Sequence, residues 1–393
     1  MRILFIAPYV PSRIRVRPFH FIKELAQRHD IHVAALGENK KAGFDELAEV
    51  VKQFHIVPHS KLRGMTQSLM ALPTPTPLCA AYCWSPAMQA YLRKLTAAEK
   101  FDVVHIEHLR AAHFAGVCGQ TPIVFDSVDC LTGLFGQMRF SKRNPVSRLL
   151  MVEEHFKLKR YEPRVLSSFQ KVVITSDSEC SELKSLGPSL TIEVVPNGVD
   201  TEYFAPMGSE KSPHRIVFSG KMGYYPNAEA ATWFATNVFP AVKTRYSDAE
   251  FVIVGSDPPS DILRLQENPG ITVTGFVDDI RPYLDSSTLA VVPMRVAVGV
   301  QNKILEAMAM ALPVVTTSIS TRPLGAGCPG VVQADGISDM IDEVIKLLDH
   351  QKSAQETGKA GRDKVVRDFS WKSSVTKLEQ AYEETIKAYQ PGR

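Results

Sequence analysis

The chain has 393 residues, of which 45% are hydrophobic and 22% are charged, and its formal net charge is +3. This length and composition indicate a globular protein of two domains with no nucleic-acid partner. They exclude a membrane-spanning protein, because no apolar run approaches the roughly 20 residues that cross a bilayer. The first residues enter a strand without a cleavage site and the six cysteines are scattered, so we expect a cytoplasmic protein with free thiols.

The first half of the chain alternates short β-branched runs with amphipathic segments. A run that is apolar on both faces is typical of a parallel strand covered by helices on both sides. We expect helices at 17–28 and from about 147 to 168. The expected strands are residues 2–10, 31–36, 102–107, 122–127, 171–176 and 192–197.

The pattern restarts after a stretch rich in Pro, Gly and polar residues at 196–214. The second set of expected strands is 215–220, 250–255, 271–276, 289–294 and 313–317, followed by a helical tail from about 337 to 389. We therefore predict an α/β protein of two doubly wound, Rossmann-like domains, which bind ligands at the carboxyl ends of their strands. The predicted parts are an acceptor-binding domain at 1–197, a linker at 198–212, a donor-binding domain at 213–370, and a C-terminal helix at 371–393 that packs back toward the first domain.

Arginines, not glycines, follow the first strand. The segment PYVPSRIRVRPFH lacks the GxGxxG pattern, which argues against a dinucleotide clamped there. Arg13, Arg15 and Arg17 indicate an anionic ligand such as a phosphate, or else solvated arginines on a loop. His20, on the helix behind them, is a further candidate for this phosphate or acceptor side.

A basic segment lies between residues 139 and 171. It holds nine basic residues against three acidic ones. It is either a solvated helix face or a surface that meets anionic lipid at the inner face of the membrane. The basic residues are Arg139, Lys142, Arg143, Arg148, Lys157, Lys159, Arg160, Arg164 and Lys171.

The second domain carries two adjacent features that suit an anion. Gly220 and Lys221 would sit at the carboxyl end of a strand, where the Gly allows close approach and the Lys supplies a charge for a phosphate. Gly299 precedes a helix expected to start near 300–302 and to run to 311, whose first amides suit a diphosphate. Lys303 opposes the helix dipole there, which makes sense with an anion in front of it, or as a surface lysine.

Glu306 follows one turn later within the apolar run KILEAMAMALPVV. A carboxylate in such a helix needs partners. The two hydroxyls of a ribose would satisfy both oxygens, and a structural ion pair is the alternative.

With these residues in place, the sequence resembles the retaining glycosyltransferases of family 4, which have the two-domain GT-B fold, over nearly its whole length. The family signature is a Glu, seven residues, a second Glu, Ala-Met-Ala, a Gly and Pro-Val-Val. Here the second Glu is Glu306, whereas Val298 replaces the first and Ala311 the later Gly. The matching segments are 194–204, 218–227, 252–258, 271–284 and 305–315.

The resemblance implies a donor site at the second domain. The phosphate-binding Arg and Lys of the family map onto Lys221 and Pro226, so Lys303 is our candidate for the missing cation. Glu306 would bind the ribose. The loss of a sugar contact at Val298 indicates a variant subset that binds its donor sugar differently. The implied donor-binding residues are Gly220, Lys221, Gly299, Val300, Gln301, Asn302, Lys303 and Glu306.

On the acceptor side, the family places a His or Asp after a middle strand. The corresponding run is PIVFDSVDC, where Asp126 or Asp129 would orient the acceptor or stabilise positive charge on the sugar, or cap the strand end. His105 and His108 are further candidates, although a His there is more often structural.

The resemblance implies a retaining transferase of polysaccharide biosynthesis. It would move a sugar from a nucleotide-diphosphate sugar, UDP before GDP, to a hydroxyl of a glycan or lipid-linked acceptor by front-face substitution. Lys221 and Lys303 would stabilise the diphosphate without a metal or other cofactor. The alternatives are a non-catalytic nucleotide-sugar-binding partner and a nucleotide-sugar epimerase of the same fold.

Overall fold

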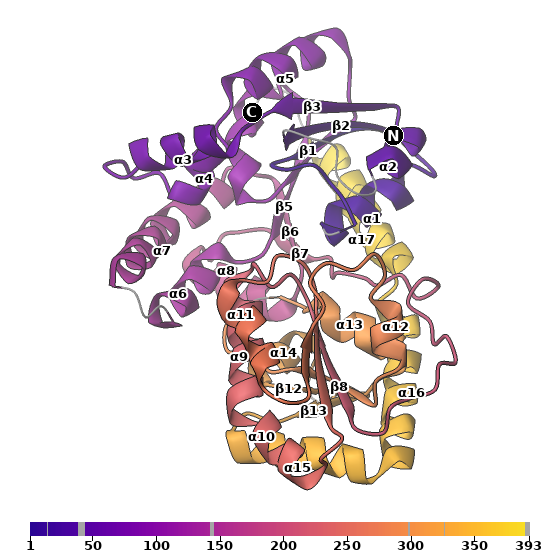
Figure 1. The fold of residues 1–393 in the computed structure, drawn as a ribbon. Coiled ribbons are helices and arrows are strands. Elements are labelled where there is room, and N and C mark those ends of the chain that lie inside the picture. The colour runs from indigo at the N-terminus through magenta and orange to yellow at the C-terminus, as the bar shows by residue number, and fades with distance from the viewer. Residues whose placement is uncertain (14, 38–43, 142–144, 298, 326, 390–393) are drawn as a thin grey trace. The chain divides into compact units, whose positions relative to one another are not determined.

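The computed structural model describes residues 1–13, 15–37, 44–141, 145–297, 299–325 and 327–389 (Figure 1). The chain divides into two compact units. Unit 1 comprises Met1–Pro196 with Trp371–Arg393, and unit 2 comprises Asn197–Ser370. Segment 198–212, expected as a linker, is part of unit 2, where the carboxylate of Asp285 accepts the amides of Met207 (3.0 Å) and Ser209 (2.7 Å).

The sheet of unit 1 has seven strands in the order β3-β2-β1-β4-β5-β6-β7, and the paired strands are parallel. The predicted parallel α/β architecture is confirmed. The strands are β1 (Arg2–Ala7), β2 (Asp30–Gly37), β3 (Gln53–Pro58), β4 (Val103–Glu107), β5 (Ile123–Val128), β6 (Lys171–Ile174) and β7 (Ile192–Val194).

Helices cover both faces of this sheet. Those before β4 are α1 (Val16–Leu25), α2 (Phe44–Val50), α3 (Lys61–Met70), α4 (Leu78–Tyr82) and α5 (Pro86–Ala98). Those after it are the 3₁₀ helix η1 (Leu109–Val117), α6 (Leu131–Ser141), α7 (Pro145–Leu166), α8 (Asp177–Leu186) and α17 (Trp371–Ala388). Segment 71–77 joins α3 to α4.

Alternation along β1 assigns its side chains to two layers. Ile3 and Phe5 are fully buried in a cluster with residues of α1 and α17, which lie side by side in Figure 1. The last helix therefore belongs to unit 1, where the hydroxyl of Tyr382 lies 2.8 Å from Nδ1 of His105 on β4.

Unit 2 contains a six-stranded sheet in the order β10-β9-β8-β11-β12-β13. The strands are β8 (Arg215–Ser219), β9 (Glu250–Val254), β10 (Ile271–Val273), β11 (Leu289–Val292), β12 (Val314–Thr316) and β13 (Val331–Gln333). The helical elements up to α13 are α9 (Tyr225–Asn237), α10 (Phe239–Arg245), α11 (Ser260–Arg264), η2 (Leu265–Glu267), α12 (Arg281–Asp285) and α13 (Asn302–Ala309). Those that follow are α14 (Ser318–Thr321), η3 (Arg322–Leu324), α15 (Ile337–Asp349) and α16 (Gln351–Asp368).

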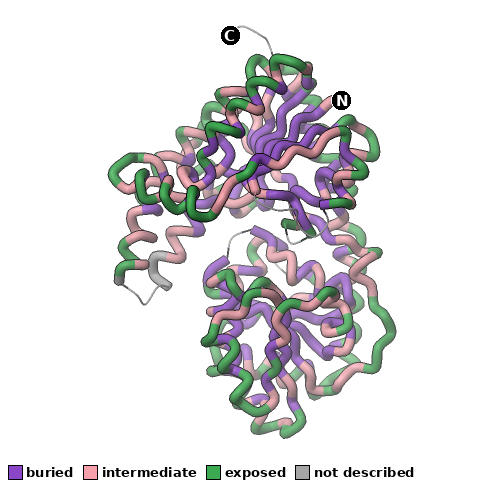
Figure 2. The backbone as a smooth tube through the Cα atoms, turned by 45° about the horizontal axis from the view of Figure 1, so that its top comes forward, coloured by how far each residue is buried: buried purple, intermediate pink, exposed green. Residues whose placement is uncertain are grey.

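The core of each unit lies along its sheet. In Figure 2 the strands run as buried segments, and exposed positions lie on the outer faces of the helices. Helix α13, expected to run to 311, ends at Ala309, and Ala311 has φ 56°. This left-handed conformation stops the helix where the family signature has a Gly.

Candidate functional site

In each sheet the strand order reverses once, and doubly wound sheets bind their ligands at this point. The reversal lies between β1 and β4 in unit 1, and between β8 and β11 in unit 2. The loops that leave these strands begin at Pro8 and His108 in unit 1, and at Gly220 and Pro293 in unit 2. These loops define one candidate site in each unit.

Glycines keep the backbone of unit 2 open at this edge. Gly255 follows β9 with φ 148°, and a Cβ atom there would lie 1.8 Å from the carbonyl oxygen of Gly220. Gly299, in the loop before α13, has φ 61°, which favours a residue without a side chain. The two glycines expected from the sequence therefore lie at the switch point, and Gly255 joins them as a residue that the sequence did not single out.

The side-chain amide of Asn227 holds Lys303 at this edge of the sheet of unit 2. Its Nζ donates to Oδ1 of Asn227 (3.0 Å), and Nδ2 of Asn227 donates to the carbonyl of Lys221 (3.0 Å). Burial lowers the pKa of Lys303 to about 8, against the opposing effect of Glu306. The lysine is thus a partly buried cation that points back across the start of α9, and is not a solvated surface residue.

Glu306 lies one turn further along α13. Burial raises the pKa of its carboxyl to about 7, while Lys303 lowers it. The carboxylate has no hydrogen-bond donor among the described residues, and it forms no ion pair with Lys303, so the structural ion pair considered from the sequence is absent. A half-buried carboxylate in this state can accept hydrogen bonds from ligand hydroxyls.

The start of α13 offers backbone amides. Gln301 is the N-cap residue, and its side chain makes no capping hydrogen bond to the helix. The amide of Ile304 donates to the carbonyl of Gln301 at 2.9 Å, which leaves the amides of Asn302 and Lys303 for a ligand. Oδ1 of Asn302 accepts from Nδ2 of Asn197 (3.2 Å), and Val300 is buried in the core of unit 2. Val298 lies outside the described residues.

Lys221 is held differently from Lys303. Its side chain is 52% exposed, and its Nζ pairs with the carboxylate of Asp257 at 3.1 Å. Asp257 follows β9 and has φ 55°. The exposed lysine is therefore available to a ligand once it leaves this ion pair.

A third cation at the edge was missed. Arg295 follows β11, is 60% exposed, and pairs with the carboxylate of Glu229 on α9 at 3.1 Å. Burial raises the pKa of Glu229, and Arg295 lowers it. In the sequence this cation is a single Arg after a strand, and its spacing to Glu229 follows no recognisable pattern.

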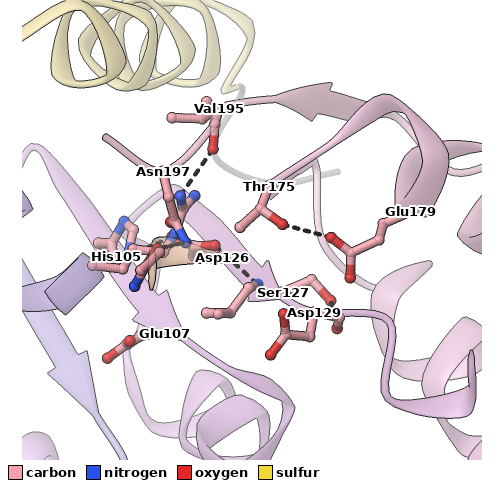
Figure 3. Close-up of polar contacts among 12 residues, drawn as sticks. His105, Glu107, Asp126, Ser127, Asp129, Thr175, Glu179, Val195 and Asn197 are labelled. Atoms are coloured by element: carbon pink, nitrogen blue, oxygen red, sulfur yellow. Dashed lines mark hydrogen bonds and ion pairs between the residues drawn. The ribbon is translucent and has the colours of Figure 1, made fainter. Parts of the chain in front are cut away.

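In unit 1, Asp126 is at the centre of a buried network (Figure 3). Its Oδ2 accepts from Nε of Arg17 at 2.7 Å, and its Oδ1 accepts the amide of Val128 at 3.0 Å. Nη1 of Arg17 donates to the carbonyl of Val195 (2.9 Å), and both charged side chains are almost completely buried. This arrangement matches the strand-end cap, the alternative considered for Asp126.

Asp129 differs, because no described residue donates a hydrogen bond to its carboxylate. Burial raises its pKa to about 6, with the nearby Arg17 opposing this. Burial also raises the pKa of the neighbouring Glu179 to about 8, although Oε1 of Glu179 accepts the amide of Cys130 (2.9 Å). Figure 3 shows Asp129 and Glu179 at the same end of the sheet. Asp129 can therefore receive an acceptor hydroxyl.

The three arginines after β1 have separate environments. Arg17 is the buried partner of Asp126, and Arg13 pairs with Glu46 at 2.9 Å. The guanidinium of Arg15 lies 4.0 Å from the centre of the Tyr9 ring and has no carboxylate partner among the described residues. Of the three, Arg15 is the one free to meet an anion.

The histidines considered from the sequence pack within unit 1. His20 stacks on Trp371 of α17, with 4.8 Å between the ring centres. His105 is fully buried, and burial lowers its pKa to about 4. His108 is also buried, with φ 70°, and its Nδ1 accepts the amide of Arg110 at 3.2 Å.

Tyr9 and Glu107 form a pair that the sequence did not indicate. The Tyr9 hydroxyl donates to Oε1 of Glu107 at 3.2 Å, between the ends of β1 and β4. Burial raises the pKa of Glu107 to about 8. Val128, close by at the end of β5, has φ 62°, which is strained for a β-branched residue. Strained backbone often marks functional sites.

The basic segment is not a uniform surface. Arg148, Lys159 and Arg160 are exposed on α7. Nζ of Lys157 instead donates to the carbonyls of Ala71 and Leu72 (both 2.9 Å). Lys171 pairs with Glu193 and Glu384. Lys142 and Arg143 lie outside the described residues.

No group of three or more His, Cys, Asp and Glu side chains in the described part of the chain has the arrangement of a metal site. None of the described helices has both the length and the apolar character needed to cross a membrane.

Comparison with known families identifies the protein class. Residues 16–203 match the family described as Glycosyltransferase Family 4, and residues 213–350 match that described as Glycosyl transferases group 1. The chain belongs to glycosyltransferase family 4. The family predicted from the sequence is thereby confirmed. The activity of this chain is the transfer of a sugar from a nucleotide sugar.

Among curated relatives, a UDP-Gal:alpha-D-GlcNAc-diphosphoundecaprenol alpha-1,3-galactosyltransferase of Escherichia coli is 25% identical over 74% of this chain and 77% of its own. A GDP-mannose-dependent alpha-(1-6)-phosphatidylinositol monomannoside mannosyltransferase of Mycobacterium tuberculosis is 26% identical over 49% of this chain and 56% of its own.

Solved structures show the same fold. Sucrose-phosphate synthase from Thermosynechococcus elongatus has a TM-score of 0.71 at 15% identity, covering 99% of this chain and 100% of its own. Anabaena HepE, in complex with UDP-glucose, has a TM-score of 0.68 at 14% identity, with the same coverage. This family 4 glycosyltransferase therefore has the GT-B fold.

Proposed function

We propose that this glycosyltransferase is a retaining enzyme that moves a sugar from a UDP-sugar onto a hydroxyl of a lipid-linked glycan acceptor. The observation that carries the donor half is the pair on α13. A partly buried cation, Lys303, and a carboxylate that has no donor among the described residues, Glu306, lie one turn apart at the switch point of unit 2. The cation and the helix amides suit a diphosphate, and the carboxylate suits the two neighbouring hydroxyls of a ribose.

The preference for uridine rests on the comparisons. The Escherichia coli relative is named for UDP-Gal, and Anabaena HepE has been crystallised with UDP-glucose. The mycobacterial relative is named for GDP-mannose, which makes a GDP-sugar the second choice. We place the diphosphate at Lys303 and the α13 amides for either nucleotide.

The reaction we propose is a front-face substitution at the anomeric carbon. The bond from that carbon to the diphosphate oxygen breaks while the acceptor oxygen bonds to the same face. The acceptor hydroxyl gives its proton to the departing diphosphate, so the products are the glycoside and UDP. The protein stabilises the negative charge that grows on the diphosphate, and fixed charges do this most effectively away from water.

Lys303 and the amides of α13 supply this stabilisation. Lys221 adds a further charge when its ion pair with Asp257 opens. We propose that these groups act without a metal or other cofactor, so that activity in excess EDTA should equal that in magnesium. A strict magnesium requirement would contradict this part of the proposal.

We place the acceptor at the switch point of unit 1. Asp129 offers a carboxylate to which no residue in the described ranges donates, and we assign it the orientation of the acceptor hydroxyl. Asp126 acts indirectly, because its carboxylate already binds Arg17 and holds the strand end. A lipid-linked acceptor is favoured because one relative described above is named for a diphosphoundecaprenol acceptor and the other for a phosphatidylinositol monomannoside.

We also propose contact with anionic membrane through α7. Its exposed cations Arg148, Lys159 and Arg160 accompany two large exposed apolar residues, Leu149 (69%) and Phe156 (58%). Basic side chains each add about 1 kcal/mol of attraction to an anionic surface. Binding to phosphatidylglycerol vesicles should exceed binding to phosphatidylcholine vesicles and should fall with salt, and equal binding to both would refute the contact.

The epimerase and the non-catalytic binder are not favoured, because the relatives described above are transferases. A direct test is incubation with UDP-sugars and a short-chain lipid-diphosphate glycan, followed by mass spectrometry of the lipid. We expect the acceptor to gain one sugar with release of UDP. Conversion of the donor without an acceptor product would favour an epimerase, and binding without any turnover would favour the binder.

A further inference from the structure

A cavity of about 350 Å³ lies in unit 1 between α3, α4, α6, α7 and η1. Its volume is at the lower end of the range for ligand pockets. The proposed donor residues belong to unit 2, and none of them lines this cavity. Its lining residues are Ser68, Leu78, Cys79, Tyr82, Arg110, Phe135, Leu150, Met151 and Glu154.

Most of the cavity wall is apolar, and its polar side chains are largely committed to the fold. Oγ of Ser68 donates to the carbonyl of Leu78 at 3.0 Å. The carboxylate of Glu154 accepts the amides of Leu78 (2.7 Å) and Cys79 (2.8 Å) at the start of α4. Such walls offer little to the hydroxyls of a sugar and suit a hydrocarbon chain.

Arg110 is the exception. Its Nε atom is buried without a hydrogen-bond partner, and its guanidinium forms no ion pair with a described residue. The nearby acid, Glu154, is occupied by the start of α4. A half-buried cation with no ion-pair partner among the described residues is costly to the fold, and an anionic ligand would lower that cost.

Arg110 also connects the cavity to the proposed acceptor site. It lies on η1, which begins directly after β4 and His108, at the switch point of unit 1. Burial raises the pKa values of Tyr9 and Cys83, and both Arg110 and Arg15 oppose this, so the two guanidinium groups lie near the same side chains. Two cations with no carboxylate partner among the described residues, Arg110 in the cavity wall and Arg15 over the Tyr9 ring, therefore lie near the switch point of unit 1.

The exposed surface beside the cavity is apolar as well. Met65 and Leu69, on α3 next to the lining residue Ser68, are 60% and 65% exposed. Leu149, adjacent to the lining residue Leu150 on α7, is 69% exposed. These exposed apolar side chains belong to two of the helices that line the cavity, so a hydrocarbon chain that extends from the cavity meets apolar side chains there.

We propose that this cavity binds the lipid part of the acceptor, a long-chain phosphate ester. The phosphate contacts Arg110, with Arg15 as its second cation, and the hydrocarbon chain lies among Leu78, Phe135 and Leu150. The inference rests on the proposed function for the identity of the ligand as acceptor, but the binding of a long-chain phosphate is measurable without turnover.

The test is calorimetric titration of the full chain with decyl phosphate, below its micelle concentration, beside decanol and inorganic phosphate. We expect decyl phosphate to bind at least tenfold more tightly than either of the others. Equal affinity for decyl phosphate and decanol would overturn the role of Arg110. Equal affinity for decyl phosphate and inorganic phosphate would overturn the role of the cavity.

Matched variants test the apolar cavity and the cation separately. Leu150→Trp fills the cavity and should weaken the binding of decyl phosphate at least tenfold, whereas Leu263→Trp changes an exposed leucine of unit 2 (45% exposed) and should have no effect. Arg110→Met should reduce the affinity to that of decanol, and Arg264→Met, at an exposed arginine of unit 2, should leave it unchanged. Met151→Trp replaces Leu150→Trp if that variant fails to fold. Equal losses in Leu263→Trp and Leu150→Trp would show that binding does not depend on the cavity and would overturn the proposal.

Release of UDP from a UDP-sugar without acceptor separates this inference from the transferase proposal. If Leu150→Trp and the wild type bind decyl phosphate equally while UDP release is normal, the lipid site alone is wrong. If the lipid binding behaves as expected and no UDP-sugar is turned over, the proposed function alone is wrong.

Discussion

Raising the pH should weaken the binding of UDP, because Lys303 loses its charge within the accessible range. Burial lowers the pKa of this lysine to about 8 from its ordinary value of 10.5. About nine tenths of Lys303 would then be protonated at pH 7 and about one tenth at pH 9. If the diphosphate needs the cation, the Kd for UDP should rise about tenfold over this interval, or by about 1.4 kcal/mol.

Protonation of Glu306 should weaken UDP binding on the acid side of the pH profile. Burial raises the pKa of its carboxyl to about 7, so it gains a proton as the pH falls from 8 to 6. The protonated carboxyl accepts fewer hydrogen bonds from ribose hydroxyls, and UDP affinity should fall again on the acid side. The strongest binding is therefore expected between pH 7 and pH 8.

The assay is calorimetric titration with UDP from pH 6 to pH 9.5, repeated in two buffers of different ionisation enthalpy. Binding near pH 8 should take up protons, because the diphosphate stabilises the charged form of Lys303. Lys303→Arg should remove the alkaline limb and Glu306→Gln the acid limb. Lys221→Met, which removes an exposed charge, should weaken binding without moving either limb. A Kd that is constant from pH 7 to pH 9 would refute the role of Lys303.

Three further predictions follow from the structure. Lys303→Met should lower turnover at least tenfold but raise the free energy of unfolding by about 1–2 kcal/mol at pH 7, because a partly buried cation is removed. This gain in stability should decrease above pH 8, the folded pKa of the lysine, and vanish near pH 10.5, since Lys303 is then neutral in both the folded and the unfolded state. Chemical denaturation at pH 7 and pH 10 checks this, and a loss of stability would contradict it. Ala311→Gly should stabilise the fold by about 0.5–1 kcal/mol, because an alanine at φ 56° is strained, and an unchanged or lower denaturation midpoint would show that the strain is negligible. Asp129→Asn should lower transfer to the acceptor at least tenfold and leave acceptor-free UDP release within twofold, and a parallel loss of both activities would remove Asp129 from the acceptor site.

Much of the fold was predictable because central strands carry strong local signals. Each predicted run became a strand, since β-branched residues buried on both faces are typical of a parallel sheet. Two edge strands were missed, β3 and β13. The residues of β3 are mostly half-buried and those of β13 number three, so neither stands out from its surroundings.

The donor site was predictable where its residues are close in sequence. Lys303 and Glu306 share one helix, and Gly299 leads into it. Asn227 was missed because it meets Lys303 from a helix 76 residues earlier in the chain. The family pattern has a cation at the position that Pro226 occupies here. The side chain that contacts Lys303 belongs to the next residue, Asn227.

The arginines of unit 1 show the limit of sequence patterns most clearly. Arg13, Arg15 and Arg17 look equivalent in the sequence. Their environments are set by residues far along the chain, Glu46 for Arg13 and Asp126 for Arg17. Only the fold distinguishes a buried structural arginine from one that is free to bind a ligand.

The central claim is that unit 2 holds a nucleotide-sugar donor through Lys303 and Glu306. Its most direct test is the release of UDP from a panel of UDP-sugars by the full chain, measured for the wild type and for Lys303→Ala. We predict release with at least one UDP-sugar, and at least a tenfold loss in a folded Lys303→Ala variant. Equal rates in the two proteins would contradict the claim.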